Sequence, residues 1–370
     1  MPINAGPEYF KAEKKYLEAK TIPEKIAGLE EMLRVGPNHK GTENLRAEIK
    51  SKIAKLRAQI EKDRLTAKGK GKGANLSIKR EGAAQVILAS LTNSGKSALI
   101  GALTNAKPLV ADYKYTTTRP EVGILDYKGV QVQMIEIPAI FEDFAYKGEG
   151  PTFFSIIRSV DLVIFLIDNT QNEKMQLDIL HKEFENAGIK LNEKRPTLTL
   201  KKQGMGGIEF LGKKYFRFDT KDATKMLTEH GYHNAILTAY EPVTLEDLAD
   251  ILNEAVVYLP LLVIHTKADI RGEGISAETG YNIEQLKEKI FKSLRLIKVY
   301  TKTPGKDKDW PPVPLHEGDT IKTLAAIIHK DFLRKFKYAR VWGTSTKHAG
   351  QTLGLEHELQ DEDVIEFHVK

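Results

Sequence analysis

Cysteine is absent from this 370-residue sequence, which excludes disulfides, zinc fingers, iron–sulfur clusters and thiol catalysis. Long apolar runs are absent as well. The longest, such as residues 161–169, have the length of a strand, whereas a membrane helix needs about 20 apolar residues. No apolar segment typical of a signal peptide follows the opening residues. The ten histidines form no HxxxH or HExxH pair and predict no metal site of their own. We therefore expect a cytoplasmic protein without a membrane partner.

Basic residues are in slight excess, and their distribution is uneven. The chain has a formal net charge of +6, with 56 Lys and Arg against 50 Asp and Glu. Met1–Gly82 alone holds 19 Lys and Arg against 11 Asp and Glu, which leaves 37 against 39 for the rest. The excess of basic over acidic residues therefore lies entirely in the N-terminal segment. Such a segment is typical of a polyanion partner, and equally of a surface that serves solubility alone.

The N-terminal segment has the pattern of amphipathic helices. Between residues 7 and 64, apolar side chains recur at helical spacing, for example at Ile26, Leu29 and Met32. Gly36-Pro37 and Gly41 interrupt the pattern, so the two longer helices are expected to form an antiparallel hairpin. A Lys- and Gly-rich linker follows and ends near Gly82. Three lysines alternate in this linker, namely Lys68, Lys70 and Lys72. They are as typical of a solvated linker as of a segment that contacts RNA phosphates.

After Gly82 the sequence alternates between short β-type runs and helical stretches. The runs 85–90, 122–127, 130–137, 161–169 and 261–267 predict an α/β domain with a mostly parallel sheet.

Two further segments differ from this alternation. Residues 191–257 interrupt it and predict an inserted α+β subdomain, with a hairpin around a glycine-rich turn and helices from Thr220 and Thr244. From about Ile297 a small α+β module follows, with a helix starting after Asp319 or Thr320.

The strongest chemical signal is SLTNSGKS, Ser90–Ser97, between an expected strand and an expected helix. A phosphate-binding loop needs backbone N–H groups at a helix N-terminus, a lysine for the β- and γ-phosphates and a hydroxyl for Mg²⁺. Lys96 and Ser97 supply the last two. The nucleotide-binding residues predicted here are Asn93, Ser94, Gly95, Lys96, Ser97 and Ala98. Ser90 stands where the usual motif has glycine, which tolerates dihedral angles that serine does not.

Two segments follow in the order that a GTPase requires. Residues 115–123, YTTTRPEVG, are similar to a switch I segment. Thr117, with Thr116 and Thr118 as alternatives, would ligate Mg²⁺ and contact the γ-phosphate, although a threonine run is also typical of a solvated loop.

The second of these segments, MIEIPAI, has Glu136 and Ala139 at the Asp and Gly positions of a DxxG motif. Glu136 can hold a Mg²⁺-bound water, and Ala139 keeps the backbone N–H for the γ-phosphate. Ile140 replaces the glutamine that orients water in many GTPases, which predicts slow intrinsic hydrolysis.

A guanine site is predicted from TKAD, Thr266–Asp269, after another apolar run. Asp269 can accept hydrogen bonds from guanine N1–H and the 2-amino group, and Lys267 can lie over the base. Thr266 replaces the more common asparagine. Ser276 and Ala277 fit the backbone contact to guanine O6. This order after a phosphate loop favours GTP, with an ATPase as the weaker alternative.

Asn93 has two interpretations. In a subset of GTPases, an asparagine at this position helps to bind K⁺, whose charge substitutes for an arginine finger. Asn93 is equally typical of a residue that turns the loop. The predicted catalytic residues are therefore Lys96, Thr117 and Asn93, the predicted Mg²⁺ ligands are Ser97, Thr117 and, through water, Glu136, and Asn93 is a candidate K⁺ ligand.

The motifs SGKS, TTTRPEVG, EIPAIFED, TKAD and SAETGYN, together with the N-terminal helices, resemble the Obg-related developmentally regulated GTP-binding protein (DRG) family. Residues 336–368 resemble the TGS domain, a β-grasp-like module. The resemblance covers nearly the whole chain. It implies a translation-associated GTPase that contacts the ribosome or RNA through its N-terminal helices and TGS domain, with a protein cofactor as a further candidate partner. Apart from the resemblance, Trp310 and Trp342 are expected in a core or an interface, with a stacking platform as the less favoured alternative.

The expected domains are the basic helical hairpin with its linker (1–82), a P-loop GTPase domain in two parts (83–190 and 258–296), the inserted α+β subdomain (191–257) and the TGS domain (297–370). The leading functional hypothesis is a Mg²⁺-dependent GTPase with slow, K⁺-stimulated hydrolysis. The alternative is a degenerate G domain that binds nucleotide as a structural ligand while other parts bind RNA or protein. Ser90, Glu136 and Ala139 motivate that alternative.

Overall fold

The structure, a computed structural model, describes residues 6–19, 21–37, 42–68, 78–104, 109–110, 120–253, 256–268 and 274–369. The chain divides into two compact units, Met1–Asn75 with Lys194–Val257, and Leu76–Glu193 with Tyr258–Lys370. We call them the first and the second unit. Among the described helices, none combines the length and the apolar character that crossing a membrane would require.

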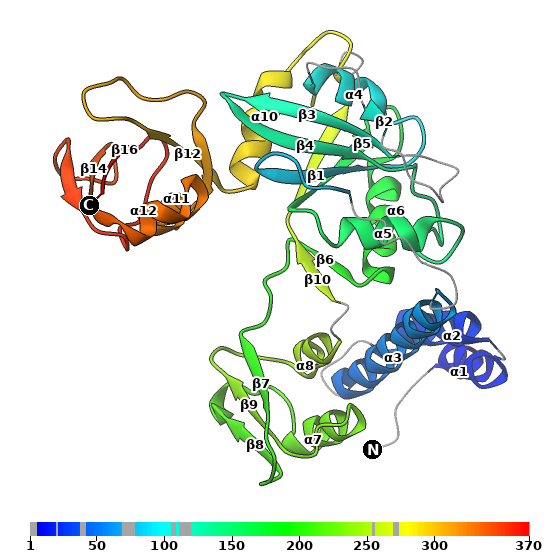
Figure 1. Cartoon of the computed structure of the whole chain (residues 1–370). Helices are drawn as coiled ribbons and strands as arrows, with labels where there is room; N and C mark the ends of the chain where they lie inside the picture. Colours follow the sequence, from blue (N-terminus) through cyan, green and yellow to red (C-terminus); the bar gives the residue numbers. More distant parts are fainter. Residues whose placement is uncertain are drawn as a thin grey trace. The chain divides into compact units, whose positions relative to one another are not determined.

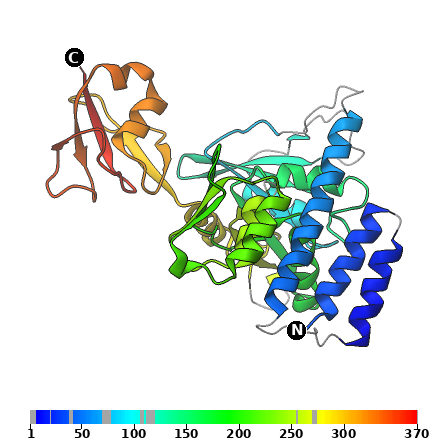
Figure 2. The same cartoon turned by 90° about the horizontal axis from the view of Figure 1, so that it is seen from below.

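The first unit begins with three helices, α1 (Pro7–Glu18), α2 (Ile22–Val35) and α3 (Glu43–Lys68), which lie side by side in Figure 2. Thr21 and Glu24 form a capping box at the start of α2. Arg46 Nη1 donates to the Leu33 carbonyl at 2.9 Å, and Arg57 Nη2 pairs with Glu30 Oε1 at 2.9 Å. Because the later residue of α3 meets the earlier residue of α2, the two helices are antiparallel, which confirms the predicted hairpin.

The inserted segment contributes β7 (Leu198–Lys202), β8 (Ile208–Leu211), the 3₁₀ turn Lys213–Tyr215, α7 (Thr220–Glu229), β9 (Ala235–Ala239) and α8 (Leu245–Leu252). The predicted helices are confirmed: α7 begins at Thr220, and Thr244 caps α8.

The predicted hairpin is wrong, because the strand order is β7-β9-β8, with β9 antiparallel to β7 and parallel to β8. The reason is burial: Leu237 on the central strand β9 lies opposite both Leu200 and Phe210, and all three pack in one apolar cluster.

The second unit contains a six-stranded sheet built from β1 (Ala84–Ala89), β2 (Leu109–Val110), β3 (Glu121–Tyr127), β4 (Val130–Glu136), β5 (Leu162–Asp168) and β11 (Leu261–Thr266). The order is β11-β5-β1-β4-β3-β2, and β11, β5, β1 and β4 are parallel. Helices α4 (Lys96–Leu103) and α10 (Ile283–Ser293) cover one face, and α5 (Gly150–Ile157) and α6 (Glu173–Asn186) cover the other (Figure 1). The mostly parallel α/β sheet is thus confirmed. Strands β6 (Ile189–Leu191) and β10 (Val257–Leu259) form a separate pair.

The C-terminal module is a five-stranded sheet of β12 (Leu296–Thr301), β13 (Val313–His316), β14 (Phe336–Trp342), β15 (Gln351–Leu353) and β16 (Val364–Val369), in the order β13-β12-β16-β14-β15. Helix α11 (Ile321–Ile328) has Thr320 as its N-cap, as predicted, and packs on the apolar face of this sheet. A short helix, α12 (Lys330–Arg334), was not predicted. Trp310 is 67% exposed, so it does not belong to the core of this chain, and its other expected place, an interface, stays a prediction.

Candidate nucleotide-binding site

The phosphate loop connects the fully buried strand β1 to helix α4. Gly95, the N-cap of α4, has φ 82°, and Asn93 has φ 61°. These are the loop positions in the left-handed region, which glycine and asparagine adopt more readily than other residues. Ser90 is not among the residues with positive φ. The loop therefore needs no left-handed conformation at this position, and serine can occupy it in place of glycine.

Ser90 holds the loop together through its side chain and its backbone. It is fully buried, and its Oγ accepts hydrogen bonds from Lys96 Nζ at 2.8 Å and from Ser94 Oγ at 2.5 Å. Its carbonyl oxygen accepts from the Ile140 amide at 2.9 Å. Burial lowers the pKa of Lys96, and the negative charge of Glu136 opposes this shift. The Lys96 ammonium group is thus fixed within the loop, where an anionic ligand would stabilise its charge.

Ser97 and Glu136 meet at the first turn of α4. Ser97 Oγ donates to Glu136 Oε1 at 3.0 Å. The other carboxylate oxygen, Oε2, is buried and accepts no hydrogen bond from any group in the described part of the chain. Burial raises the pKa of Glu136, although the Ser97 hydrogen bond and the Lys96 charge act against it. Hydroxyl and carboxylate oxygens are the ligands that Mg²⁺ prefers, and an unsatisfied buried oxygen can accept from a metal-bound water, so these residues fit a Mg²⁺ ion.

The segment after β4 is attached to its surroundings at several points. The Ile140 side chain is 1% exposed, so it packs in the interior and offers no polar atom to a water molecule. Glu183 of α6 is also 1% exposed, and its two carboxylate oxygens accept from the amides of Asp143 at 2.9 Å and Ala145 at 2.8 Å. Burial raises the pKa of Glu183 against these hydrogen bonds. Nothing in the sequence pattern distinguishes Glu183 from an ordinary helical glutamate.

The expected base-recognition segments are connected to each other and to the phosphate loop. Thr266 Oγ1 donates to the Ser94 carbonyl at 2.9 Å. The Ala268 amide donates to the Ile275 carbonyl at 3.0 Å, and the buried Ser276 donates its amide to Tyr281 at 3.1 Å. Ser276 thus has its N–H already bonded, whereas Ala277 follows it in the turn.

Lys267 makes a contact that the sequence analysis missed. Its Nζ lies 2.7 Å from Oδ2 of Asp168, which is 1% exposed at the end of β5. Burial would raise the pKa of Asp168, but hydrogen bonds from Lys267 and Thr170 outweigh it and the pKa is lowered. Asp168 thereby balances the positive charge of Lys267. The alkyl chain of Lys267 stays available to lie over a base. The position of an acid at the end of an apolar strand was the signal that could have indicated it.

Two of the predicted site segments lie outside the described residues. They contain Thr116, Thr117 and Thr118 on one side of the site and Asp269 on the other. In the part of the chain that is described, no group of three or more His, Asp or Glu side chains is arranged to hold a metal ion.

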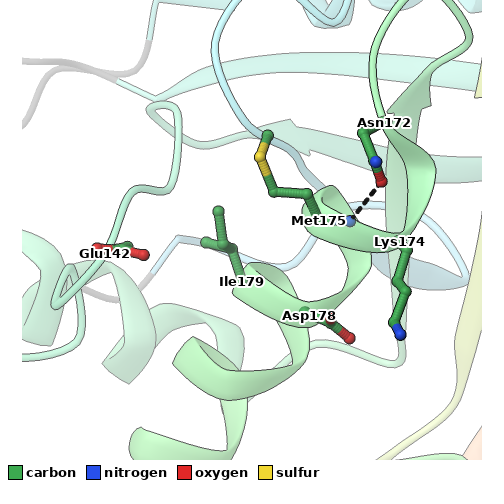
Figure 3. Close-up of a pocket in the computed structure, with 6 residues that line it drawn as sticks. All are labelled: Glu142, Asn172, Lys174, Met175, Asp178 and Ile179. Atoms are coloured by element: carbon green, nitrogen blue, oxygen red, sulfur yellow. Dashed lines mark hydrogen bonds between the residues drawn. The ribbon is translucent and has the colours of Figure 1, made fainter.

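A pocket of 420 Å³ lies at the start of α6 (Figure 3). Its lining residues are Glu142, Asn172, Lys174, Met175, Asp178 and Ile179. Asn172 Oδ1 accepts from the Met175 amide at 3.0 Å and caps α6. The lining includes no residue of the phosphate loop or of TKAD, so this pocket is not the nucleotide site itself.

The fold and this loop define a P-loop GTPase domain, and comparisons with known proteins agree. Residues 85–202 match the family described as "50S ribosome-binding GTPase", residues 205–296 match the C-terminal region of that domain, and residues 297–369 match the TGS domain.

Relatives extend over nearly the whole chain. An uncharacterised GTP-binding protein of Methanocaldococcus jannaschii is 35% identical, with 94% of this chain and 93% of that protein covered. Developmentally-regulated GTP-binding protein 2 of Homo sapiens is 32% identical (94% and 99% covered), and developmentally-regulated G-protein 3 of Arabidopsis thaliana is 31% identical (94% and 98% covered). The chain belongs to the developmentally regulated GTP-binding protein family. It is a GTP-binding protein with a GTPase domain and a TGS domain, as predicted.

Proposed function

We propose that this protein hydrolyses GTP slowly, with Mg²⁺ required and K⁺ stimulating, and that it acts in translation by contacting the ribosome or RNA. The observation that carries the proposal is the arrangement of Lys96, Ser97 and Glu136 at the N-terminus of α4, with the unpartnered Glu136 Oε2 beside them. This set of one cation and several oxygen ligands matches what a Mg²⁺-nucleotide needs.

In the proposed mechanism, the backbone amides of Asn93–Ala98 bind the phosphates and Lys96 neutralises the β- and γ-phosphate oxygens. Ser97 would hold Mg²⁺ directly and Glu136 would hold it through a water, with Thr117 as the second proposed protein ligand. When bound, the ion would offset negative charge that develops on the phosphate oxygens. No covalent intermediate is needed, because transfer to water depends on positioning and electrostatics.

The expected low rate follows from the segment after β4. The Ile140 side chain is buried, and its amide is bonded to Ser90. This position therefore offers no side chain that could orient the attacking water. Ala139 would still present its backbone N–H to the γ-phosphate.

Asn93 supports the K⁺ part of the proposal. It is exposed within the phosphate loop, and its carboxamide oxygen is a ligand type that K⁺ accepts. Its left-handed backbone is also what asparagine adopts in turns without any ion, so the interpretation as a turn residue is the competing one.

Guanine selection is assigned to Asp269, with Lys267 over the base and Ser276 and Ala277 near guanine O6. The bonds from Thr266 to Ser94 and from Ala268 to Ile275 support this proposal, because they connect the segments that carry these residues to the phosphate loop.

Ribosome or RNA contact is proposed through the N-terminal helices and the TGS domain, in the cytoplasm, with a protein cofactor as a further partner. The description of the family that residues 85–202 match names ribosome binding, and the whole chain has relatives in one GTP-binding family. The second candidate function is a G domain whose bound nucleotide is structural. Ala139 and the buried Ile140 favour it. Alanine lacks the backbone freedom of the usual glycine, and the Ile140 side chain cannot orient a water as the usual glutamine does.

The deciding experiment is the GTP hydrolysis rate of the purified full chain with Mg²⁺, in KCl and in NaCl at equal ionic strength. Faster turnover in KCl, lost in Asn93→Ala, is the expected result. Turnover that is equal in both salts would remove the K⁺ site. GTP binding without turnover in either salt, and also without turnover after ribosomes are added, would favour the structural-nucleotide alternative.

A further inference from the structure

Two groups of opposite charge lie close together in the phosphate site and are not paired. The negative charge of Glu136 opposes the lowering of the Lys96 pKa, and the positive charge of Lys96 opposes the raising of the Glu136 pKa. Lys96 is buried, and Oε2 of Glu136 is buried without a hydrogen bond. Opposite charges attract strongly where water is largely excluded. These two side chains are both described, yet they form no ion pair with each other, so other groups hold them apart.

The hydroxyl group of Ser90 holds the ammonium group of Lys96. Ser90 Oγ accepts from Lys96 Nζ at 2.8 Å and from Ser94 Oγ at 2.5 Å, and it donates its own proton to the Leu91 carbonyl at 2.9 Å. A hydroxyl has one donor and two acceptor positions, and all three are used here. Ser90 is also fully buried. Its oxygen is therefore a fixed acceptor rather than a rotating group.

A second serine holds the carboxylate. Ser97 Oγ donates to Glu136 Oε1 at 3.0 Å, so each of the two charged groups is bonded to a neutral hydroxyl. An ammonium group has three donors, and the bond to Ser90 uses one of them. Two donors of Lys96 and the oxygen Oε2 of Glu136 thus stay available for a ligand. An ion pair between Lys96 and Glu136 would consume both.

Ser90 and Glu136 are also the positions where this chain departs from the usual motifs, which have glycine and aspartate there. Glutamate is one methylene longer than aspartate, so its carboxylate reaches farther from β4 towards the phosphate loop. Glycine has no side chain that could hold the lysine. With glutamate at 136 and glycine at 90, the ammonium group and the unbonded Oε2 would be free to join. The two departures are therefore connected through Lys96.

We propose that Ser90 is a positioning residue that keeps Lys96 from pairing with Glu136, and that the serine compensates for the longer carboxylate at position 136. It rests on the Mg²⁺-nucleotide site of the proposed function, because the groups that Ser90 keeps available are the ones assigned there to the phosphates and the metal. The competing explanation is that the hydroxyl only shapes the loop through Ser94. The two explanations differ in whether the effect of Ser90 depends on the length of the side chain at position 136.

The test measures the affinities of the full chain for GTP, GDP and GMP with Mg²⁺, by displacement of a fluorescent GTP analogue. Ser90→Gly should weaken GTP and GDP by roughly tenfold, because their phosphates must first break a bond between charged groups. GMP has no β- or γ-phosphate and should bind as before. In a Glu136→Asp background, Ser90→Gly should change GTP affinity little, since the shorter carboxylate does not reach Lys96. The two positions should thus be coupled by about tenfold.

Two further variants control for folding. Ser90→Ala removes the hydroxyl without adding backbone freedom, and it should weaken GTP and GDP as Ser90→Gly does. The φ of Ser90 is not positive, so alanine fits there. The matched control is Thr104→Val, which removes another buried hydroxyl, bonded to the Ile100 carbonyl at 2.7 Å at the end of α4. Its nucleotide affinities should equal those of the wild type. Denaturant unfolding shows that each variant is folded before its affinities are compared.

The outcomes separate this proposal from the proposed function. Equal weakening of GTP, GDP and GMP in Ser90→Gly, or the same loss in the Glu136→Asp background, would overturn it in favour of a loop-shaping role. Unchanged or tighter GTP binding in Ser90→Gly would overturn it as well, because the hydroxyl would then be idle or compete with the phosphates. A wild-type chain that binds GTP without turnover would contradict the proposed hydrolysis alone, since the test reads only affinities.

Discussion

The phosphate loop and the inserted subdomain both carry charged side chains, but the environments of these side chains are opposite. Around the loop, Lys96 and Asp168 are buried and Glu136 is half-buried, and burial disfavours the charged form of each. On the inserted subdomain, the lysines of residues 201–214 are exposed. Electrostatic interactions are strong where the dielectric is low and weak where water screens them. Single substitutions should therefore have large effects at the loop and small effects on the subdomain.

The largest effect is expected from Lys96→Ala. Removing the ammonium group leaves the nucleotide phosphates without their main cation and should weaken GTP binding by about 3 kcal/mol, roughly a factor of 100 or more. Titration of the full chain with a fluorescent GTP analogue measures this. Lys182→Ala, which removes an exposed lysine from α6, is the matched control and should bind normally. An unchanged dissociation constant for Lys96→Ala would mean that this loop does not bind the phosphates.

The next effect concerns stability. Glu183→Ala removes two hydrogen bonds to the amides of Asp143 and Ala145 and leaves the buried Ala145 amide without its acceptor. Hydrogen bonds to a charged group contribute about 1.5 to 3 kcal/mol each, so a loss of about 3 kcal/mol in the free energy of unfolding is expected. Denaturant unfolding measures it. A loss below about 1 kcal/mol would show that the segment after β4 is held by its apolar contacts alone.

Glu183 also predicts a pH dependence with a defined sign. Burial raises its pKa in the folded chain above the ordinary value of 4.5. The folded state then binds the proton more tightly than the unfolded state, so stability is fully present below pH 4.5 and falls as pH rises through the folded pKa. Glu183→Gln should flatten this decline when unfolding is measured at a series of pH values. An identical pH profile in the variant would assign the decline to other groups.

A smaller change is expected at Glu136. Glu136→Gln keeps the shape and an acceptor for Ser97 but removes the negative charge beside the proposed metal. Mg²⁺ should then be required at roughly tenfold higher concentration, because removing an outer-sphere ligand typically costs about 10- to 100-fold in metal affinity. A Mg²⁺ titration of GTP binding, with binding in EDTA as the control, measures the shift. Equal Mg²⁺ requirements would contradict the role of Glu136.

The smallest effect is expected on the first unit, from Lys55→Ala. Lys55 and Glu229 are paired but 38% and 48% exposed. Exposed pairs typically contribute less than about 1 kcal/mol, so a loss near 0.5 kcal/mol in the free energy of unfolding is expected, and less at high salt. A loss as large as that of Glu183→Ala would contradict the contrast between the two regions.

Local patterns predicted much of the fold and of the site. The strand, loop and helix around Lys96 are consecutive in the chain, and the start of α7 at Thr220 follows from capping chemistry within a few residues. The error at β7 and β8 has a different origin. Proximity in the sequence favoured a hairpin, whereas the apolar face of β9 placed Leu237 between Leu200 and Phe210. Strand order depends on which pairing buries more apolar surface, and a local pattern does not contain that information.

The sequence by itself determined the order of the nucleotide-binding motifs, the α/β character of the domain and the presence of a TGS module, because each depends on residues close together in the chain. Only the tertiary structure decided that Ser90 fits its position without a left-handed backbone and that Glu183 accepts from the amides of Asp143 and Ala145. It also decided that Lys50 and Lys55 form ion pairs with Glu246 and Glu229. The lysines of the inserted sheet form no ion pair with any described residue. Burial and pairing depend on distances in space, and chain folding brings together groups that are far apart in the sequence.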